Sequence, residues 1–339
     1  MEKAKSKDTP INRQQPIMNN SQPTITDKNK VNKILPPIPP SSSLNLSSPS
    51  NQPPDNKIVS SNEDTKLAIS IQQIEKSIIK TYRNSIWRPF CTAINEYQLI
   101  QNGDKIGVCI SGGKDSMLMA KCFQELLRHG KVNFSLEFIV MDPGYVGTNR
   151  QRIIDNLQKL GIKAQIFDSK IFDVTSSVGG SPCYLCARMR RGNLYSFAQN
   201  LGCNKIALGH HFDDCIETIL MGQMYNGQIQ TMMPKLKSAN FAEMQLIRPL
   251  YLVEEKAIIN WVTYNQLNFI RCGCPLSEDC TDPKVSKRSE VKQLIRTLSQ
   301  TNPNLKQNLF KSVYNINLDA VLGYKSKGEQ HSFLDDYDK

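Results

Sequence analysis

The sequence has few aromatic residues, few histidines, no long apolar run and no secretory signal. Aromatic residues make up 7% of its 339 residues, and only four residues are histidines. No stretch of about 18 apolar residues occurs, which excludes a membrane-spanning helix. Residues 1–16 lack the apolar centre of a secretory signal, so we expect a cytoplasmic protein. Its ten cysteines are therefore expected to be reduced and to serve metal binding or catalysis.

The composition changes near residue 64. Residues 1–63 hold most of the proline, serine and asparagine clusters and show no periodic apolar pattern. Such a segment buries too little apolar surface to offset its chain entropy, so we predict a disordered amino-terminal arm. The rest has a globular composition. We divide it into a helical segment (64–103), a main domain (104–300) and a partly helical tail (301–339).

The net charge is +11 and the isoelectric point is about 9.1. Residues 1–63 contain eight Lys/Arg and five Asp/Glu, so a charge of +8 belongs to the globular part. A basic balance of this size favours a polyanionic partner such as a nucleic acid. The alternative is a basic protein whose charges only keep it soluble.

Short apolar runs alternate with segments that have helical periodicity. This alternation predicts an α/β fold with a parallel sheet and helices on both of its faces. Ligands of such folds bind at the carboxyl ends of the strands, so the loops after the strands are the informative places. The expected strands are 104–110, 134–141, 163–168, 205–209 and 244–251. The expected helices are one or two within 65–100, and then 114–130, 149–161, 187–202, 213–227 and 254–267.

The loop after the first expected strand reads ISGGKDS, residues 110–116. Its two glycines let the backbone approach an anion, and the helix that follows offers unpaired N–H groups. A lysine and two serines add a charge and hydroxyl donors. The common P-loop motif is not met, because an aspartate follows the lysine. The pattern predicts a phosphate cradle, with a tight turn and a solvated lysine as the alternative.

This loop resembles the pyrophosphatase loop of N-type ATP pyrophosphatases, the PP-loop superfamily. The resemblance implies an adenine nucleotide α-hydrolase-like, Rossmann-like fold that splits ATP between its α- and β-phosphates and leaves an adenylated substrate. It also implies catalytic roles for Lys114, Asp115 and Asp214. The ATP-binding residues that we expect are Ser111, Gly112, Gly113, Lys114, Asp115, Ser116, Met141, Gly209 and His210.

The loop after the fourth expected strand reads ALGHHFDDCIET, residues 207–218. Two histidines, His210 and His211, stand directly before the carboxylates of Asp213 and Asp214 at the start of a helix. Adjacent carboxylates beside phosphates usually hold Mg²⁺. One of them could instead act as a base toward the substrate. Asp213 could also simply cap the helix.

A cysteine pair and three arginines share the segment GGSPCYLCARMRRGN, residues 179–193. The spacing of Cys183 and Cys186 suits a metal, an iron–sulfur cluster or a redox disulfide. Arginines suit a polyanion, and a solvated basic face is the alternative. Helical spacing places Arg188 and Arg191 on one face with Tyr195, whereas Arg190 points elsewhere. We expect Cys91, Cys109, Cys122, Cys203 and Cys215 to be ordinary core residues.

Together, PCYLCARMRRG and KIALGHHFDD resemble the tRNA 2-thiocytidine synthetase family (TtcA-type), a branch of the PP-loop superfamily. The match runs from about residue 84 to 300 and includes Gly103-Asp104, Pro234-Lys235-Leu236 and IRPL at 247–250. It implies a 4Fe–4S cluster held by Cys183, Cys186 and one late cysteine, with an open iron for hydrosulfide. Here the late pair is Cys272-Gly273-Cys274, one residue shorter than the family pattern. We assign the third ligand to Cys274, with Cys272 as the alternative.

The resemblance implies that ATP, with Mg²⁺, adenylates the C2 carbonyl oxygen of a tRNA cytidine at position 32 and releases pyrophosphate. Sulfur then replaces the oxygen, and AMP leaves. We expect tRNA contacts from Arg188, Arg190, Arg191 and Lys235, and weaker ones from Arg248, Lys287 and Arg288. The expected partners are tRNA, a sulfur donor (a cysteine desulfurase or sulfide) and possible second copies in a homodimer. The alternatives are a tRNA 2-thiouridine synthetase, another PP-loop enzyme with a closed zinc site, and an inactive nucleotide-binding module.

Overall fold

The computed structural model describes residues 69–337 except 146, 170, 172–181 and 271–285. These residues all belong to one compact unit, Thr65–Lys339. The arm predicted for residues 1–63 lies outside the described residues, as do Cys272, Cys274 and Cys280. The further divisions at residues 103 and 300 stay predictions.

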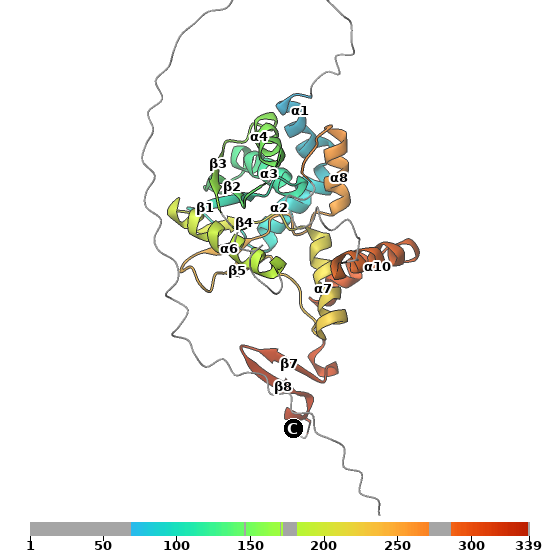
Figure 1. Cartoon of the computed structure of the whole chain (residues 1–339). Helices are drawn as coiled ribbons and strands as arrows, with labels where there is room; N and C mark the ends of the chain where they lie inside the picture. The colour runs from blue at the N-terminus through green and yellow to red at the C-terminus, as the bar shows by residue number, and fades with distance from the viewer. Residues whose placement is uncertain (1–68, 146, 170, 172–181, 271–285, 338–339) are drawn as a thin grey trace, which may run out of the picture. The chain divides into compact units, whose positions relative to one another are not determined.

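A six-stranded sheet forms the centre of the molecule (Figure 1). Its strand order is β3-β2-β1-β4-β6-β5, and all neighbouring pairs are parallel except β5 with β6. The mostly parallel α/β fold predicted from the sequence is therefore confirmed. The strands are β1 (Lys105–Ile110), β2 (Ser135–Asp142), β3 (Ala164–Asp168), β4 (Lys205–Ala207), β5 (Lys235–Lys237) and β6 (Gln245–Ile247).

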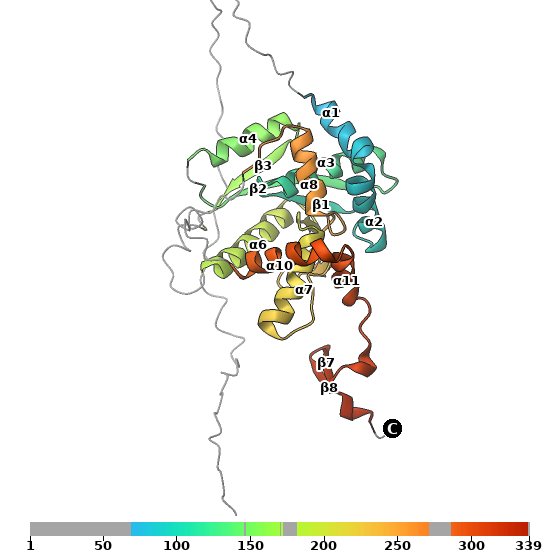
Figure 2. The ribbon, with the colours of Figure 1, turned by 90° about the vertical axis from the view of Figure 1, so that its right-hand side faces the viewer.

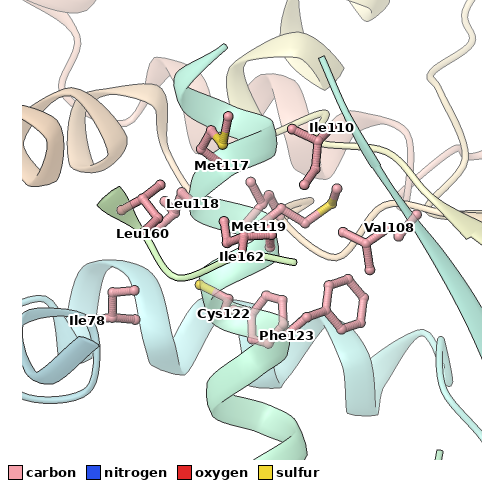
Figure 3. Close-up of a cluster of buried hydrophobic side chains, with 14 of the residues drawn as sticks. Ile78, Val108, Ile110, Met117, Leu118, Met119, Cys122, Phe123, Leu160 and Ile162 are labelled. Carbon is pink, nitrogen blue, oxygen red and sulfur yellow. The ribbon is translucent and has the colours of Figure 1, made fainter. Parts of the chain in front are cut away.

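Helices cover both faces of this sheet, and Figure 2 shows α3 and α4 on one side and α6 on the other. Successive side chains of β1 point to opposite faces of the sheet, and both faces are apolar: Val108 packs in one cluster and Cys109 in another. The first cluster is the larger core, drawn in part in Figure 3. The helices here are α3 (Lys114–His129), α4 (Asn149–Lys159), α6 (Pro182–Asn200) and α8 (Glu255–Tyr264).

The amino-terminal helical segment packs into the larger core through Ile74, Ile78 and Phe90. It consists of α1 (Ile71–Lys76), two short π-helical stretches (Ser77–Thr81 and Arg83–Trp87) and α2 (Arg88–Glu96). The buried ammonium of Lys121 on α3 lies 2.6 Å from the carboxylate of Glu75 on α1. This ion pair fixes the segment against the domain.

Three further helices form a separate apolar cluster beside the sheet. They are α7 (Phe212–Asn226), α10 (Lys287–Thr301) and α11 (Leu305–Ser312), joined through Phe212, Ile295 and Phe310. The remaining elements are a hairpin of β7 (Gly323–Ser326) and β8 (Glu329–Ser332) between two short 3-10 turns, Leu318–Ala320 and Phe333–Asp335. Among the described residues, no helix is both long and apolar enough to cross a membrane.

The strand order places β1 beside β4. The chain continues from β1 to β2, toward one edge of the sheet, and from β4 to β5 and β6, toward the other edge. A crevice forms at such a switch point, outside the carboxyl ends of the two strands. The loops 111–116 and 208–211 both start there. The fold therefore brings together the two loops that the sequence marked as functional.

Candidate active site

The loop after β1 closes on itself through its two serines. The hydroxyl of Ser116 accepts the Ser111 backbone N–H at 3.1 Å and lies 3.0 Å from the carbonyl of Gly113. Gly112 has a φ of +83°, and a Cβ there would lie 2.6 Å from Cγ1 of Ile153. Only glycine tolerates both the angle and the contact. No described side chain caps the start of α3 at Gly113, and the first N–H groups of a helix have no partner within it, so they are available to a phosphate.

The loop after β4 packs directly on the start of α3. A Cβ at Gly209 would lie 3.0 Å from the backbone nitrogen of Ser116, so this position accepts no side chain without a shift. The contact brings His210 and Asp214 to the side of the cradle. Sequence reasoning found Gly209 only through the family resemblance, because its role depends on a neighbour far away in the chain.

A cavity of about 380 Å³ lies where these loops meet. Its volume falls within the range of small-molecule sites. It gathers predicted ATP-binding residues from three strand ends, together with side chains of α6 and α10. The lining residues include Ser111, Asp115, Ser116, Met141, Tyr145, Arg190, Leu194, Gly209, His210, Asp214 and Arg288.

Two carboxylates of this cavity flank one histidine. The Nε2 atom of the buried His211 lies 3.9 Å from Asp115 and 3.6 Å from Asp214. Asp214 also accepts the backbone N–H of His211 at 3.0 Å. Oxygen ligands that converge beside a phosphate cradle are what Mg²⁺ requires.

Asp213 lies elsewhere, so the structure does not bring the predicted aspartate pair to one place. Its carboxylate lies 2.6 Å from the ammonium of Lys306 and accepts the backbone N–H of Glu255 at 2.7 Å. Successive helical residues point about 100° apart, which separates the two side chains. Asp213 thus connects α7 to α8 and α11.

Lys114 lies between two acids. Its ammonium is 3.1 Å from Asp115 and 3.2 Å from Glu255, and the other oxygen of Glu255 is 2.6 Å from Lys292. Burial acts to lower the pKa of Lys114, but the carboxylates of Asp115 and Glu255 outweigh it and raise the pKa. Burial likewise opposes the charge of Glu255, yet Lys292 and Lys114 lower its pKa to about 2.

His210 is held neutral. Burial lowers its pKa to about 4, and the positive charge of Arg248 acts in the same direction. A neutral imidazole can accept or donate a hydrogen bond but adds no charge at physiological pH. The side chain therefore suits contact with an uncharged part of a ligand.

The two faces of α6 serve different cavities, as the helical spacing predicts. Arg190 and Leu194 line the cavity at the cradle, whereas Arg188, Arg191 and Tyr195 line another. The half-buried Cys186 stands one turn before Arg190, on the same side of the helix.

Cys183 belongs to the first turn of α6, but its side chain lies outside the described part of the chain, as do Cys272 and Cys274. Within the described ranges, no three side chains of His, Cys, Asp or Glu are grouped to hold a metal ion. The predicted cluster ligands therefore stay a prediction. Of the cysteines expected in the core, Cys109, Cys122, Cys203 and Cys215 are buried and Cys91 is partly buried.

Several basic residues that were expected to contact tRNA also make contacts within the protein. The ammonium of Lys235 donates to the Gln98 carbonyl at 2.8 Å, and that of Lys287 lies 4.9 Å from the centroid of the Tyr225 ring. Arg248 is only 8% exposed, so it is not part of an open surface. Isolated charges in a sequence carry no signal of these tertiary contacts.

Arg288 is exposed and also lines the cavity at the cradle. It lies 3.1 Å from Asp214 and 3.6 Å from Glu217. Its helix, α10, also supplies Lys292, the partner of Glu255. Sequence analysis missed Glu255 and Lys292 because neither belongs to a loop that follows a strand.

Comparisons with known proteins agree with this geometry. Residues 83–273 match the profile of the PP-loop domain family. The tRNA-cytidine(32) 2-sulfurtransferase of Geobacter sulfurreducens is 35% identical over 240 residues, which cover 70% of this chain and 90% of that protein. The protein of the same name from Citrifermentans bemidjiense is 37% identical over 227 residues, 66% of this chain and 87% of that protein.

A solved structure shares the fold. It is the U34-tRNA thiolase NcsA from Methanococcus maripaludis with its 4Fe–4S cluster, and it superimposes with a TM-score of 0.53 and 22% identity. The match covers 68% of this chain and 79% of that one. At this identity the likeness supports the fold alone.

The strand-end cradle and the profile match define a PP-loop protein. Within that class, the chain belongs to the tRNA-cytidine(32) 2-sulfurtransferase family. It is therefore an enzyme of the transferase class, as the sequence resemblance predicted.

Proposed function

We propose that this enzyme uses ATP to adenylate the C2 carbonyl oxygen of the cytidine at position 32 of tRNA and then replaces that oxygen with sulfur. The observation that carries the proposal is the cavity at the switch point, where the cradle, two carboxylates and Arg190 converge. The names of the relatives supply the base and its position.

ATP is proposed to bind with its phosphates on Ser111–Ser116 and its remaining atoms near Met141, Gly209 and His210. The positive φ of Gly112 and the close contact of Gly209 keep both loops free of Cβ atoms, which fits a phosphate group. Lys114 lies at the first position of α3, where its charge and the helix N–H groups act on the same anion.

Asp115 and Asp214 are the groups that fit a Mg²⁺ ion bound to the triphosphate. Asp214 is the favoured member of the predicted pair, since Asp213 is engaged by Lys306 and Glu255. The ion would neutralise charge on the leaving pyrophosphate. A cation already lies beside each carboxylate, Lys114 at 3.1 Å from Asp115 and Arg288 at 3.1 Å from Asp214.

The chemistry proceeds in two displacements. The C2 carbonyl oxygen attacks the α-phosphorus, the bond to the β-phosphate oxygen breaks, and pyrophosphate leaves. A sulfide nucleophile then attacks C2, the C2–O bond breaks, and AMP departs with the former carbonyl oxygen. Neither step changes the oxidation state of the base. Preorganised positive groups stabilise the charge that develops in the first step.

Cys183, Cys186 and Cys274, with Cys272 as the alternative third ligand, are proposed to hold a 4Fe–4S cluster that supplies the sulfur. Cys186 stands on the face of α6 that also carries Arg190 and Leu194 of the nucleotide cavity. Sulfur and adenylate would thus meet at one wall. A cysteine desulfurase or free sulfide would replenish the sulfur.

The RNA is proposed to lie across the amino-terminal half of α6. Arg188 and Arg191 are exposed there, and Arg190 reaches toward the nucleotide cavity. Lys235 is a lesser contributor because its ammonium already donates to Gln98. A base inside an RNA loop must leave its stack to reach the cavity. Cytoplasmic location and a homodimer belong to the same proposal.

Anaerobically purified full-length protein tests the function with ATP, sulfide and tRNA that lacks 2-thiocytidine. We expect 2-thiocytidine in the digested nucleosides by mass spectrometry, and one pyrophosphate for each base modified. Lys114→Ala should slow 2-thiocytidine formation and pyrophosphate release by on the order of 10²-fold or more. Formation of 2-thiouridine instead would overturn the cytidine assignment.

An absorption band near 400 nm that is lost in Cys186→Ala would support the cluster, and a colourless zinc protein would exclude it.

A further inference from the structure

A second cavity lies on the opposite side of α6 from the nucleotide cavity. Its volume is about 460 Å³, within the range of small-molecule sites. One wall is α6, and the wall opposite is the segment 236–241, which begins within β5; Leu246 and Arg248 complete the lining. Its charged lining residues are Arg188, Arg191, Lys237 and Arg248, and none of its lining residues is an acid.

Arg248 is the buried cation of this cavity. It is 8% exposed, and one terminal nitrogen donates to the carbonyl of Met233. Its Nε atom has no hydrogen-bond partner, and no described carboxylate forms an ion pair with it. A buried guanidinium normally has an acid beside it, because an unpaired charge in the interior is costly. The missing counter-charge points to an anionic ligand.

The side walls fit a nucleotide rather than a bare ion. Tyr195 on α6 stacks on Phe241 with ring centroids 5.1 Å apart and planes 14° from parallel. Ser238 and Asn240 add polar groups on the opposite wall. Guanidinium groups bind phosphate oxygens in pairs, and the edges of the stacked rings can contact a ribose or a base.

We propose that this cavity binds one phosphate of the RNA substrate, with its nucleotide lying between α6 and the segment 236–241. Arg248 at the base and Arg188 and Arg191 at the rim contact the phosphate oxygens. This inference rests on the proposed function, because it takes RNA as the substrate. It adds an anchoring site distinct from the ATP cavity, with α6 as the wall between them.

The test compares the double variant Arg188→Ala/Arg191→Ala with Arg152→Ala, which removes an exposed arginine from α4 on the other face of the sheet. Binding of fluorescent tRNA is measured by anisotropy at several salt concentrations, and ATP binding by calorimetry. We expect the double variant to bind tRNA about tenfold more weakly. Its salt slope, the magnitude of the slope of log K against log salt concentration, should fall by about one or more. ATP affinity should match wild type.

Arg248→Lys supplies a second readout, because it keeps the charge but loses the forked geometry. We expect this variant to keep the melting temperature of wild type, which shows that it folds. Its tRNA affinity should fall, but its salt slope should fall less than that of the double variant.

Two outcomes would overturn the proposal. The first is a double variant with the tRNA affinity and salt slope of Arg152→Ala. The second is normal tRNA binding with lost affinity for ATP or AMP, which would make the cavity a site for a free nucleotide. Both readouts need no turnover, so a changed salt slope would support the anchoring site even if no thiolated base formed.

Discussion

At the scale of single residues, neighbours in the sequence have different functions. Asp213 and Asp214 are adjacent, yet Asp213 joins three helices and Asp214 faces the cavity at the cradle. Arg190 and Arg191 are separated in the same way by the turn of α6. A motif with paired residues therefore needs the helix geometry before either residue is given a role.

The aspartate pair supplies a matched test. Asp214→Asn should slow pyrophosphate release by on the order of 10²-fold, because it removes a carboxylate beside the cradle. Asp213→Asn should chiefly lower the melting temperature, since it weakens the contacts with Lys306 and Glu255. Pyrophosphate assays and thermal melts of both variants check this. Equal loss of activity in the two variants would contradict this difference and would assign Asp213 to the metal site as well.

Glu255 predicts an acid-dependent loss of stability. Its pKa is lowered from 4.5 to about 2 in the folded protein, so it stabilises the fold above pH 4.5 and loses this effect as the pH falls toward 2. The contribution is at most about 3 kcal/mol. Urea denaturation at pH 5 and pH 3 should show a smaller difference between wild type and Glu255→Gln at the lower pH. Glu254→Gln, which removes a more exposed carboxylate, is the control.

At the scale of elements, α10 completes the site from a distant part of the chain. It directs Arg288 at Asp214 and Lys292 at Glu255, and it follows the segment that contains Cys272 and Cys274. Two of the cations that contact acids at the site therefore come from one helix near the end of the chain.

Arg288→Ala should weaken ATP binding by about tenfold, as expected for loss of a charge-assisted contact to a phosphate. Arg296→Ala on the same helix is the control, because Arg296 lines a different cavity. Calorimetry with ATP measures both, alongside their melting temperatures. A normal ATP affinity in Arg288→Ala would limit this residue to holding Asp214.

A buried ion pair joins β4 to the turn before β1. Lys205 lies 2.6 Å from Asp104 and donates to the carbonyl of Leu99 at 3.0 Å. Asp104→Asn leaves the lysine charge buried and unpaired, so we expect a loss of about 3–5 kcal/mol in the free energy of unfolding. Glu137→Gln breaks a partly exposed pair with Lys105 and should cost less than about 1 kcal/mol. Denaturant titrations of the two variants compare them.

At the scale of the whole molecule, the alternation of apolar runs and helical periods predicted the parallel sheet and its helices. The strand predicted at 244–251 is shorter, at Gln245–Ile247, because Arg248 and Tyr251 turn away to contact Met233 and Met232. Strand β5 was not predicted, since Lys235–Lys237 is too short and too polar to show a pattern. The hairpin of β7 and β8 was not predicted either, for the same reason.

The sequence by itself determined the sheet, the phosphate cradle and the family, because apolar periodicity and glycine-rich loops are local properties of the chain. Only the tertiary structure decided which carboxylate faces the cradle, that Arg288 reaches it from α10, and that Arg248 lies buried with no acid beside it among the described residues. These depend on contacts between residues far apart in the chain. Such contacts are set by packing around the sheet and leave no local pattern.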